Sequence, residues 1–302
     1  MTPEQVKFLN EIAGELKTQS GFNLREEVFF PLRYDKNCPL TVQHQQIAQE
    51  LMPKDSRLGK GYYATSIGTT SQNVVLAMVN LYKEEMEKDG VNLDILINGQ
   101  KGQKGTWRKA YYWLWNHKYL RWLDANSWEI LQEKAKSPPN WLKFFTEDEA
   151  NKIGLNKGAY LELPPPPEMP PTIPVNKKLW MAIDLEYPNY QLLLFNRSKQ
   201  GTVLYCPSFG YAIDAIMDKP PFLLPQKYSW AGKTGQKFIF KETGKEEFLA
   251  IVLENSLHLS WLTPKREEAL PEWNVERIKE LFEELEKQGN WQVFYQSFEV
   301  VE

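Results

Sequence analysis

A run of prolines divides this sequence and constrains its fold more than any other feature. The segment LPPPPEMPPTIP, residues 163–174, holds seven prolines in twelve positions. Proline lacks an amide hydrogen and fixes φ, so this segment cannot continue as a helix or as a central strand. We therefore expect a semi-rigid polyproline linker between two domains, residues 1–162 and 175–302. A ligand for a proline-reading domain is the alternative use of this composition.

Length and charge agree with two domains and limit the kinds of partner. The 302 residues exceed the usual length of one compact domain, and the 42% of hydrophobic residues supply enough material for buried cores. A net charge of −3 argues against a surface built throughout to coat nucleic acid or an anionic membrane. Any basic patch must therefore be local.

Cysteine usage and the first residues predict a cytoplasmic protein. Cys38 and Cys206 are the two cysteines, too few for a disulfide framework, which fits a reducing compartment. The stretch MTPEQVKFLNEIAGEL carries acids within an amphipathic pattern and does not resemble a secretory signal. No run of about 18 apolar residues occurs, so we expect no membrane span.

The residues before the prolines are expected to be mainly helical. Their apolar positions recur at spacings of three and four, as an amphipathic helix requires. The expected helices cover residues 3–17, 40–51 with Thr41 as N-cap, 69–88, 107–123 and 125–136. Between them, VNLDILI, residues 91–97, alternates as a half-buried strand does, and a turn is expected at Asn98 and Gly99.

After the prolines, short segments rich in β-forming residues predict an antiparallel β-rich domain. Strands are expected in KKLWMAIDLEY, YQLLLFNR, TVLYCP, QKFIFKE, FLAIVLE and WQVFYQSFEVV. One helix is expected in NVERIKELFEELEKQ, with Asn274 as N-cap and Gly289 as its stop. The predicted fold class is α+β, with a mainly helical, winged-helix domain followed by this β-rich domain with one helix.

Residues 98–123 interleave basic and aromatic side chains. Lysine and arginine can neutralise phosphates while exposed rings stack on bases, so a nucleic-acid surface is one interpretation. Its candidate residues here are Lys101, Lys104, Trp107, Arg108, Lys109, Lys118 and Arg121. The other interpretation is a core helix or protein interface, because Tyr111, Trp115, Tyr119 and Trp122 share one side of a helical wheel.

Two segments upstream resemble the paired helices of a winged helix-turn-helix domain. They are QHQQIAQEL and SQNVVLAMVNLYKEE, although the connecting residues 53–70 are longer than the family's usual turn. The resemblance implies that Gln72 and Asn73 lie on the recognition helix, where amide side chains reach base edges.

Catalytic and cofactor patterns are not found in the sequence. Gly232-Lys233-Thr234 ends like a phosphate-binding loop, but Lys227 stands where that loop needs its first glycine, so a β-turn is the better interpretation. The three histidines lack the close spacing of metal ligands, and Cys38 and Cys206 have no local catalytic partner. We therefore expect no enzyme, no cofactor and no metal.

Residues 190–256 carry a second resemblance. The strand, turn and strand of LLLFNRSKQGTVLYCPS, the later LLP and the run GKEEFLAIV are similar to the bacterial family of domains of unknown function that is numbered 4384. That family is often attached to caspase-like peptidases or protein kinases. The resemblance implies an accessory module of a signalling or defence system. The leading prediction is a non-enzymatic adaptor that binds a partner protein of such a system, and the alternative is a DNA-binding regulator that uses residues 98–123.

Overall fold

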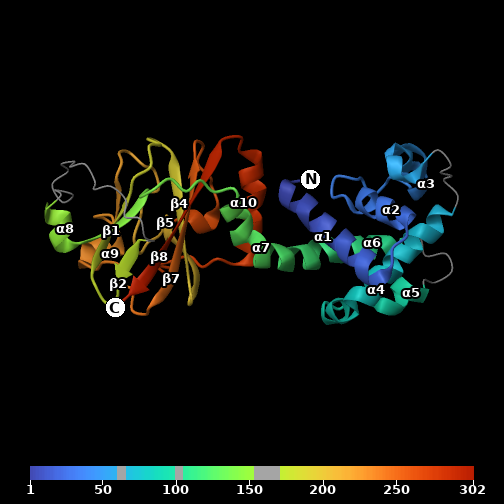
Figure 1. Cartoon of the computed structure of the whole chain (residues 1–302), viewed down its shortest axis with the longest axis horizontal. Coiled ribbons are helices and arrows are strands. Elements are labelled where there is room, and N and C mark those ends of the chain that lie inside the picture. The colour runs from blue at the N-terminus through green and yellow to red at the C-terminus, as the bar shows by residue number, and fades with distance from the viewer. Residues whose placement is uncertain (60–65, 99–104, 153–170) are drawn as a thin grey trace. The chain divides into compact units, whose positions relative to one another are not determined.

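The computed structural model describes residues 1–59, 66–98, 105–152 and 171–302 (Figure 1). The chain divides into two compact units, Met1–Ala125 and Asn126–Glu302. Helices and sheets together make the fold α+β. Within the described ranges, no helix combines the length and the apolar character needed to cross a membrane.

The division between the units does not fall at the prolines, where it was expected. Residues 163–170 of the expected linker lie outside the described residues, and Thr172–Pro174 form a strand, β2. Strand β1 (Leu142–Thr146) belongs to the second unit because it pairs with a later strand over its whole length. The reason is burial, since Leu142 and Phe144 belong to an apolar cluster whose other members come mostly from residues after the prolines.

The first unit is built from helices that begin at recognisable caps. The side chains of Thr2 and Asn23 each accept a hydrogen bond from a backbone amide of the helix that follows, and the side chains of Gln5 and Glu26 accept one from the backbone amides of Thr2 and Asn23. Gly21 ends the first helix in the left-handed conformation. Its α-helices are α1 (Pro3–Ser20), α2 (Leu24–Tyr34), α3 (His44–Gln46), α4 (Ile67–Lys88), α5 (Leu93–Asn98) and α6 (Thr106–Trp113), and the boundary between the units falls within α7 (Tyr119–Glu133).

Two wider π turns adjoin these helices. Ile47–Leu51 follows α3 and Leu114–Lys118 connects α6 to α7. The helix expected over residues 40–51 therefore begins at the cap Gln43 rather than at Thr41 and changes its winding after Gln46. The expected helix over residues 107–123 is likewise present but interrupted.

The prediction of a strand at residues 91–97 is wrong. The segment forms α5, and its buried residues are Leu93 and Leu96, at the spacing of one helical turn. Gly99 of the expected turn lies outside the described residues. The described part of the first unit contains no strand, and the winged-helix expectation is not confirmed.

The second unit contains two sheets. A three-stranded sheet has the order β1-β3-β6, and a five-stranded sheet has the order β2-β8-β7-β4-β5. Their strands besides β1 and β2 are β3 (Leu179–Ile183), β4 (Gln191–Ser198), β5 (Gly201–Cys206), β6 (Phe222–Leu224), β7 (Gly244–Leu253) and β8 (Trp291–Val301). The pairing is antiparallel as expected except between β2 and β8, which is parallel. The segment QKFIFKE contributes only an isolated bridge, between Phe238 and Leu179.

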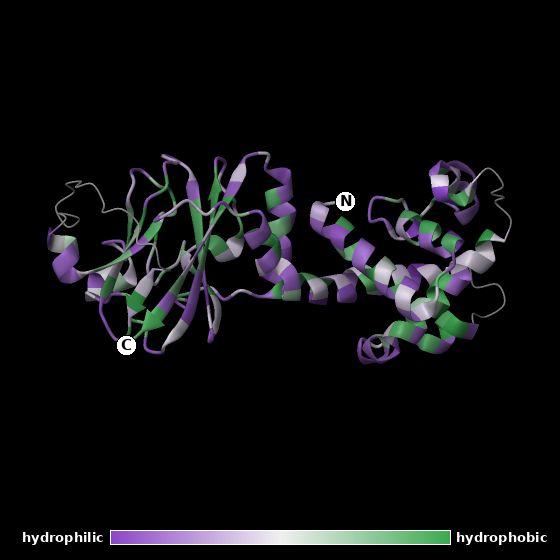
Figure 2. Cartoon of the chain, viewed as in Figure 1, coloured by the Kyte–Doolittle hydropathy of each residue, from purple (hydrophilic) through white to green (hydrophobic). Residues whose placement is uncertain are grey.

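Apolar side chains from both sheets form a single core. Phe144 of β1 meets the rings of Phe248 and Phe298 at centroid distances of 5.5 and 5.1 Å. The expected helix is α10 (Val275–Lys287), capped by Asn274, and green and purple residues alternate along it in Figure 2. Its buried residues are Ile278, Leu281, Phe282 and Leu285. Two short helices were not expected, α8 (Glu147–Lys152) and α9 (Trp230–Thr234).

Candidate functional site

The aromatic side chains of residues 107–122 form core contacts in the first unit. Trp107, Tyr111, Trp113, Trp115 and Tyr119 are buried, whereas Tyr112 is 49% exposed. Phe8 of α1 packs edge-on against Trp115 and Tyr119, with ring centroids 5.5 and 5.2 Å away. Rings used in this way are not free to stack on bases.

The basic candidates of the same segment are partly neutralised within the chain. Lys118 lies 2.7 Å from the carboxylate of Glu85, and Arg121 lies 2.9 Å from that of Asp89. Arg108 donates to the carbonyl of Leu40 at 3.1 Å. Lys109 is exposed, and Lys101 and Lys104 lie outside the described residues.

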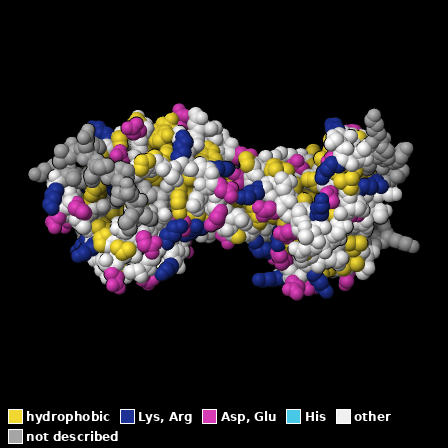
Figure 3. Space-filling model, viewed as in Figure 1, with side chains coloured by type: hydrophobic (Ala, Val, Ile, Leu, Met, Phe, Trp, Pro, Cys, Tyr) yellow, Lys and Arg dark blue, Asp and Glu magenta, His cyan; other side chains and the backbone are white. Residues whose placement is uncertain are grey.

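The two amide candidates on α4 also bond within the unit. Gln72 donates to the carbonyl of Leu96 at 3.3 Å, and Asn73 donates to Glu26 at 2.7 Å. Figure 3 shows basic and acidic side chains interspersed on the visible face, with no large area of one sign. The described candidates therefore do not form a single basic surface.

His44 is a partly buried polar residue of this unit that sequence reasoning left unassigned. Its Nε2 lies 3.0 Å from Ser71 Oγ, and among the described residues its Nδ1 has no hydrogen-bond partner. The rings of Phe29 and Trp107 pack against it at 5.3 and 5.2 Å. Burial, with the positive charges of Arg33 and Arg108, lowers the pKa of His44 to about 4.

Protonation of His44 is therefore expected to destabilise the first unit. The folded-state pKa lies below the ordinary value of 6.5, so the unfolded chain binds the proton more readily. The stability that the neutral ring contributes is fully present above the ordinary pKa of 6.5 and is lost as the pH falls toward 4. It amounts to about 3 kcal/mol, at about 1.4 kcal/mol for each pKa unit.

Denaturant unfolding followed by circular dichroism, at about pH 7 and about pH 4, tests this expectation. The wild-type protein should lose more stability between the two pH values than His44→Gln does. The exposed residue His258 provides a control, because His258→Gln should retain the wild-type loss. Equal losses in the wild type and His44→Gln would contradict the expectation.

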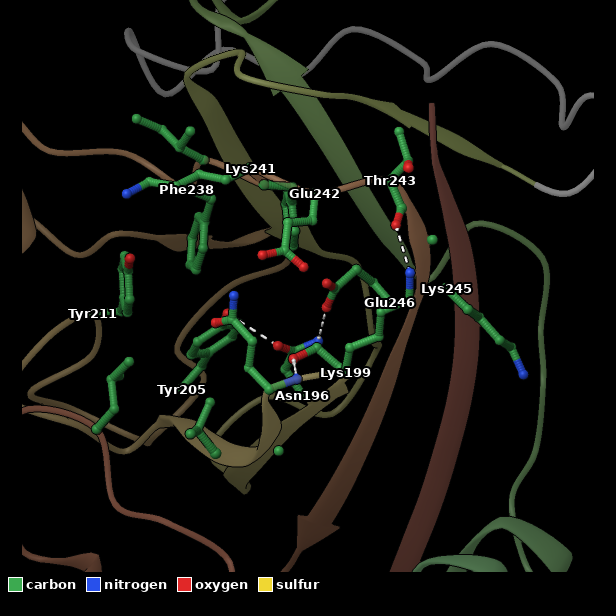
Figure 4. Close-up of a pocket in the computed structure, with 18 residues that line it drawn as sticks. Asn196, Lys199, Tyr205, Tyr211, Phe238, Lys241, Glu242, Thr243, Lys245 and Glu246 are labelled. Atoms are coloured by element: carbon green, nitrogen blue, oxygen red, sulfur yellow. Dashed lines mark hydrogen bonds between the residues drawn. The ribbon is translucent and has the colours of Figure 1, made fainter. Parts of the chain in front are cut away.

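The candidate functional site is a cavity of about 420 Å³ in the second unit. It lies between the hairpin of β4 and β5 and residues 238–246, which lead into β7. Figure 4 shows the labelled side chains around it, and Asn196, Tyr205 and Glu246 come from three neighbouring strands. The pairing of those strands brings together residues that are 50 positions apart in the sequence.

A hydrogen-bond network fixes one side of the cavity. Tyr205 donates its hydroxyl to Asn196 Oδ1 at 3.1 Å. Asn196 Nδ2 donates to Glu246 Oε2 at 2.8 Å and to the carbonyl of Glu247 at 3.3 Å. Asn196 is only 3% exposed, so these bonds satisfy a polar group that would otherwise be costly to bury. The network also fixes the orientation of the Glu246 carboxylate.

Aromatic rings form another part of the cavity lining. Tyr211 and Phe238 stack with centroids 4.2 Å apart and planes at 13°. Tyr205 packs against both, at 5.3 and 5.2 Å. Burial raises the pKa of Tyr205 and of Tyr211, so both phenols stay neutral at ordinary pH. A planar group entering this cavity would meet ring surface on one side.

Two carboxylates face the same space. Figure 4 shows those of Glu242 and Glu246 directed into the cavity. Burial raises the pKa of Glu246, an effect that the hydrogen bond from Asn196 opposes. Two of the three lysines that line the cavity are engaged elsewhere, since Lys199 donates to the carbonyl of Thr243 at 3.1 Å and Lys245 lies 2.9 Å from Glu247. Among the described residues, Glu246 has no ion-pair partner.

Sequence reasoning did not identify this cavity. One signal was available, because Asn196 directly follows the apolar run LLLF within an expected strand. A polar residue at such a position has to be satisfied by partners, and its partners mark the site. Those partners could not be named without the strand order.

The cysteines and other candidate ligands do not add a reactive centre to the described residues. Burial raises the pKa of Cys206 well above its ordinary value and also raises that of Cys38, so both favour the neutral thiol. In the described ranges, no three His, Cys, Asp or Glu side chains are grouped so that they could hold a metal ion. The Gly232-Lys233-Thr234 segment lies in α9 and forms no β-turn.

The chain matches no protein-family model, no curated protein and no solved structure. The candidate function therefore rests on the geometry of the cavity.

Proposed function

We propose that this protein is a non-enzymatic adaptor that holds a partner protein through the cavity of its second unit. The cavity is the observation that carries the proposal. It combines ring surface with oriented polar groups, the combination that anchors a side chain at protein interfaces. The resemblance of residues 190–256 to an accessory bacterial family favours a partner from a signalling or defence system.

The neighbourhood of the cavity offers further contact area. Ile239 lines it and is 43% exposed. An anchor side chain in the cavity, surrounded by contacts that exclude water, is the usual organisation of a binding hot spot. The polar groups of Asn196, Tyr205 and Glu246 are held in place before the partner arrives, which reduces the entropy lost on binding.

Site-specific photo-crosslinking in the source cells tests the proposal. A photoreactive amino acid at Ile239 should crosslink to one partner protein. The same group at Tyr228, which is 70% exposed and does not line the cavity, is the control and should not yield that adduct. Adding Tyr211→Ala should weaken binding about thirtyfold, the effect of losing an aromatic anchor contact. An unchanged adduct yield in the Tyr211→Ala background would refute the proposal.

A further inference from the structure

We infer that the cavity of the second unit binds an arginine side chain of the partner protein, an inference that rests on the proposed function. The chemistry of the lining identifies this occupant. Two carboxylates and a stacked pair of rings surround the same space. A guanidinium group is both cationic and planar, so it is the side-chain group that suits carboxylates and ring faces together.

The carboxylate of Glu246 is prepared for a cation. Its Oε2 accepts from Asn196, while its Oε1 has no hydrogen-bond partner among the described residues. Leaving a half-buried carboxylate without a positive partner is unfavourable, and the raised pKa of Glu246 expresses this cost. An arriving guanidinium would remove it by supplying charge-assisted hydrogen bonds.

Among the described residues, none of the three lysines that line the cavity, Lys199, Lys241 and Lys245, pairs with Glu246. The ammonium group of Lys199 donates to the carbonyl of Thr243. Its side chain lies against Gly244, because a Cβ added to that glycine would be 3.0 Å from Lys199 Nζ. Figure 4 shows that Lys245 points away from the cavity, and this side chain pairs with Glu247. The negative charge of Glu246 is therefore left for a ligand.

The rings explain the preference for arginine over lysine. Tyr211 and Phe238 stack face to face, so their inner faces cover each other. Phe238 is only 2% exposed, and the partly buried Tyr211 therefore supplies the ring surface that a ligand can reach. A guanidinium packs flat on such a surface and still directs its N–H groups sideways to carboxylates, whereas a lysine ammonium is a compact point charge. Citrulline has nearly the shape of arginine without the charge, so it separates charge recognition from fit.

An NMR titration of the isotopically labelled full chain tests the inference. The probes are the N-acetylated amides of arginine, citrulline and lysine. The arginine probe should shift the amide signals of Asn196, Glu246 and Gly244, with an affinity about tenfold above that of either other probe. Glu246→Gln keeps an oxygen that can accept from Asn196 but lacks the charge, and should weaken arginine binding about tenfold. Glu299→Gln removes one exposed charge from β8 and should bind like the wild type.

Failure of this inference can be told apart from failure of the proposed function. Equal binding of arginine and citrulline, equal binding of arginine and lysine, or no binding of arginine would each overturn the arginine assignment. If crosslinking from Ile239 still captured a partner in a Tyr211-dependent manner, the adaptor proposal would stand without it. If both experiments failed, the cavity would have no role in partner binding.

Discussion

Trp113→Ala is expected to lower the free energy of unfolding of the first unit by about 4 kcal/mol. Trp113 is 2% exposed, and its indole N–H donates to Asp89 at 2.7 Å. Its ring also packs against that of Tyr82 at a centroid distance of 5.5 Å. Truncation would leave a large cavity and would remove one of the hydrogen bonds that hold the Asp89 carboxylate.

Tyr112, the neighbour of Trp113, is a matched control. It is 49% exposed, and Tyr112→Ala should change stability by no more than about 0.5 kcal/mol. Denaturant unfolding of the full chain, followed by the helical circular dichroism signal, measures both variants. Similar losses in the two variants would show that the aromatic helix is not organised around a buried side as described.

Gly232→Ala is expected to destabilise the second unit by about 3 kcal/mol or more, the range reached when an atom is forced into a filled space. A Cβ at this position would lie 2.0 Å from the carbonyl oxygen of Gln226 and 2.9 Å from that of Lys227. Both are backbone atoms, so no side-chain rotation can make room. Residues 226–232 would have to move and would give up the bond from the Gly232 amide to Ser229 Oγ.

The same change is expected to affect the cavity. The amide of Gln226 donates to the carbonyl of Tyr211 at 2.9 Å, so this loop supports one of the rings in the lining. Gly289→Ala is the control, because nothing lies within 4 Å of a Cβ there. Thermal unfolding and arginine titration of both variants test the expectation. A Gly232→Ala protein as stable as Gly289→Ala would contradict the close approach of these backbone segments.

Elements with long, repeated patterns were predicted from the sequence, and elements that depend on distant partners were not. The helices α1, α4 and α10 carry enough turns for their apolar period to be read, and Asn274 caps α10 as expected. Helix α5 has only six residues, too few to separate a helical spacing from alternation. The pairing of β1 with β3 connects residues on opposite sides of the prolines, so no local sequence pattern predicts it.

The candidate site was harder to predict than the fold for the same reason. Residues 98–123 combine charged and aromatic side chains in one stretch of sequence, which made them the candidate site. In the structure, most of the described rings of this stretch lie in the core, and Lys118 and Arg121 pair with acidic residues. The cavity residues Asn196 and Glu246 stand in different strands, and strand register alone places them in contact. Local composition could not show that relation.

The strand order of the larger sheet has a consequence for how the second unit is made. Strand β8 follows all the other strands in the sequence, yet it lies inside the sheet, between β2 and β7. While a ribosome is still synthesising residues 291–301, β7 can pair with β4 but has an unpaired edge on its other side. The apolar run FLAIVL of β7 is then available to other unfinished chains. Completion of β8 closes that edge, so the interval before its synthesis is when the nascent chain most needs protection from aggregation.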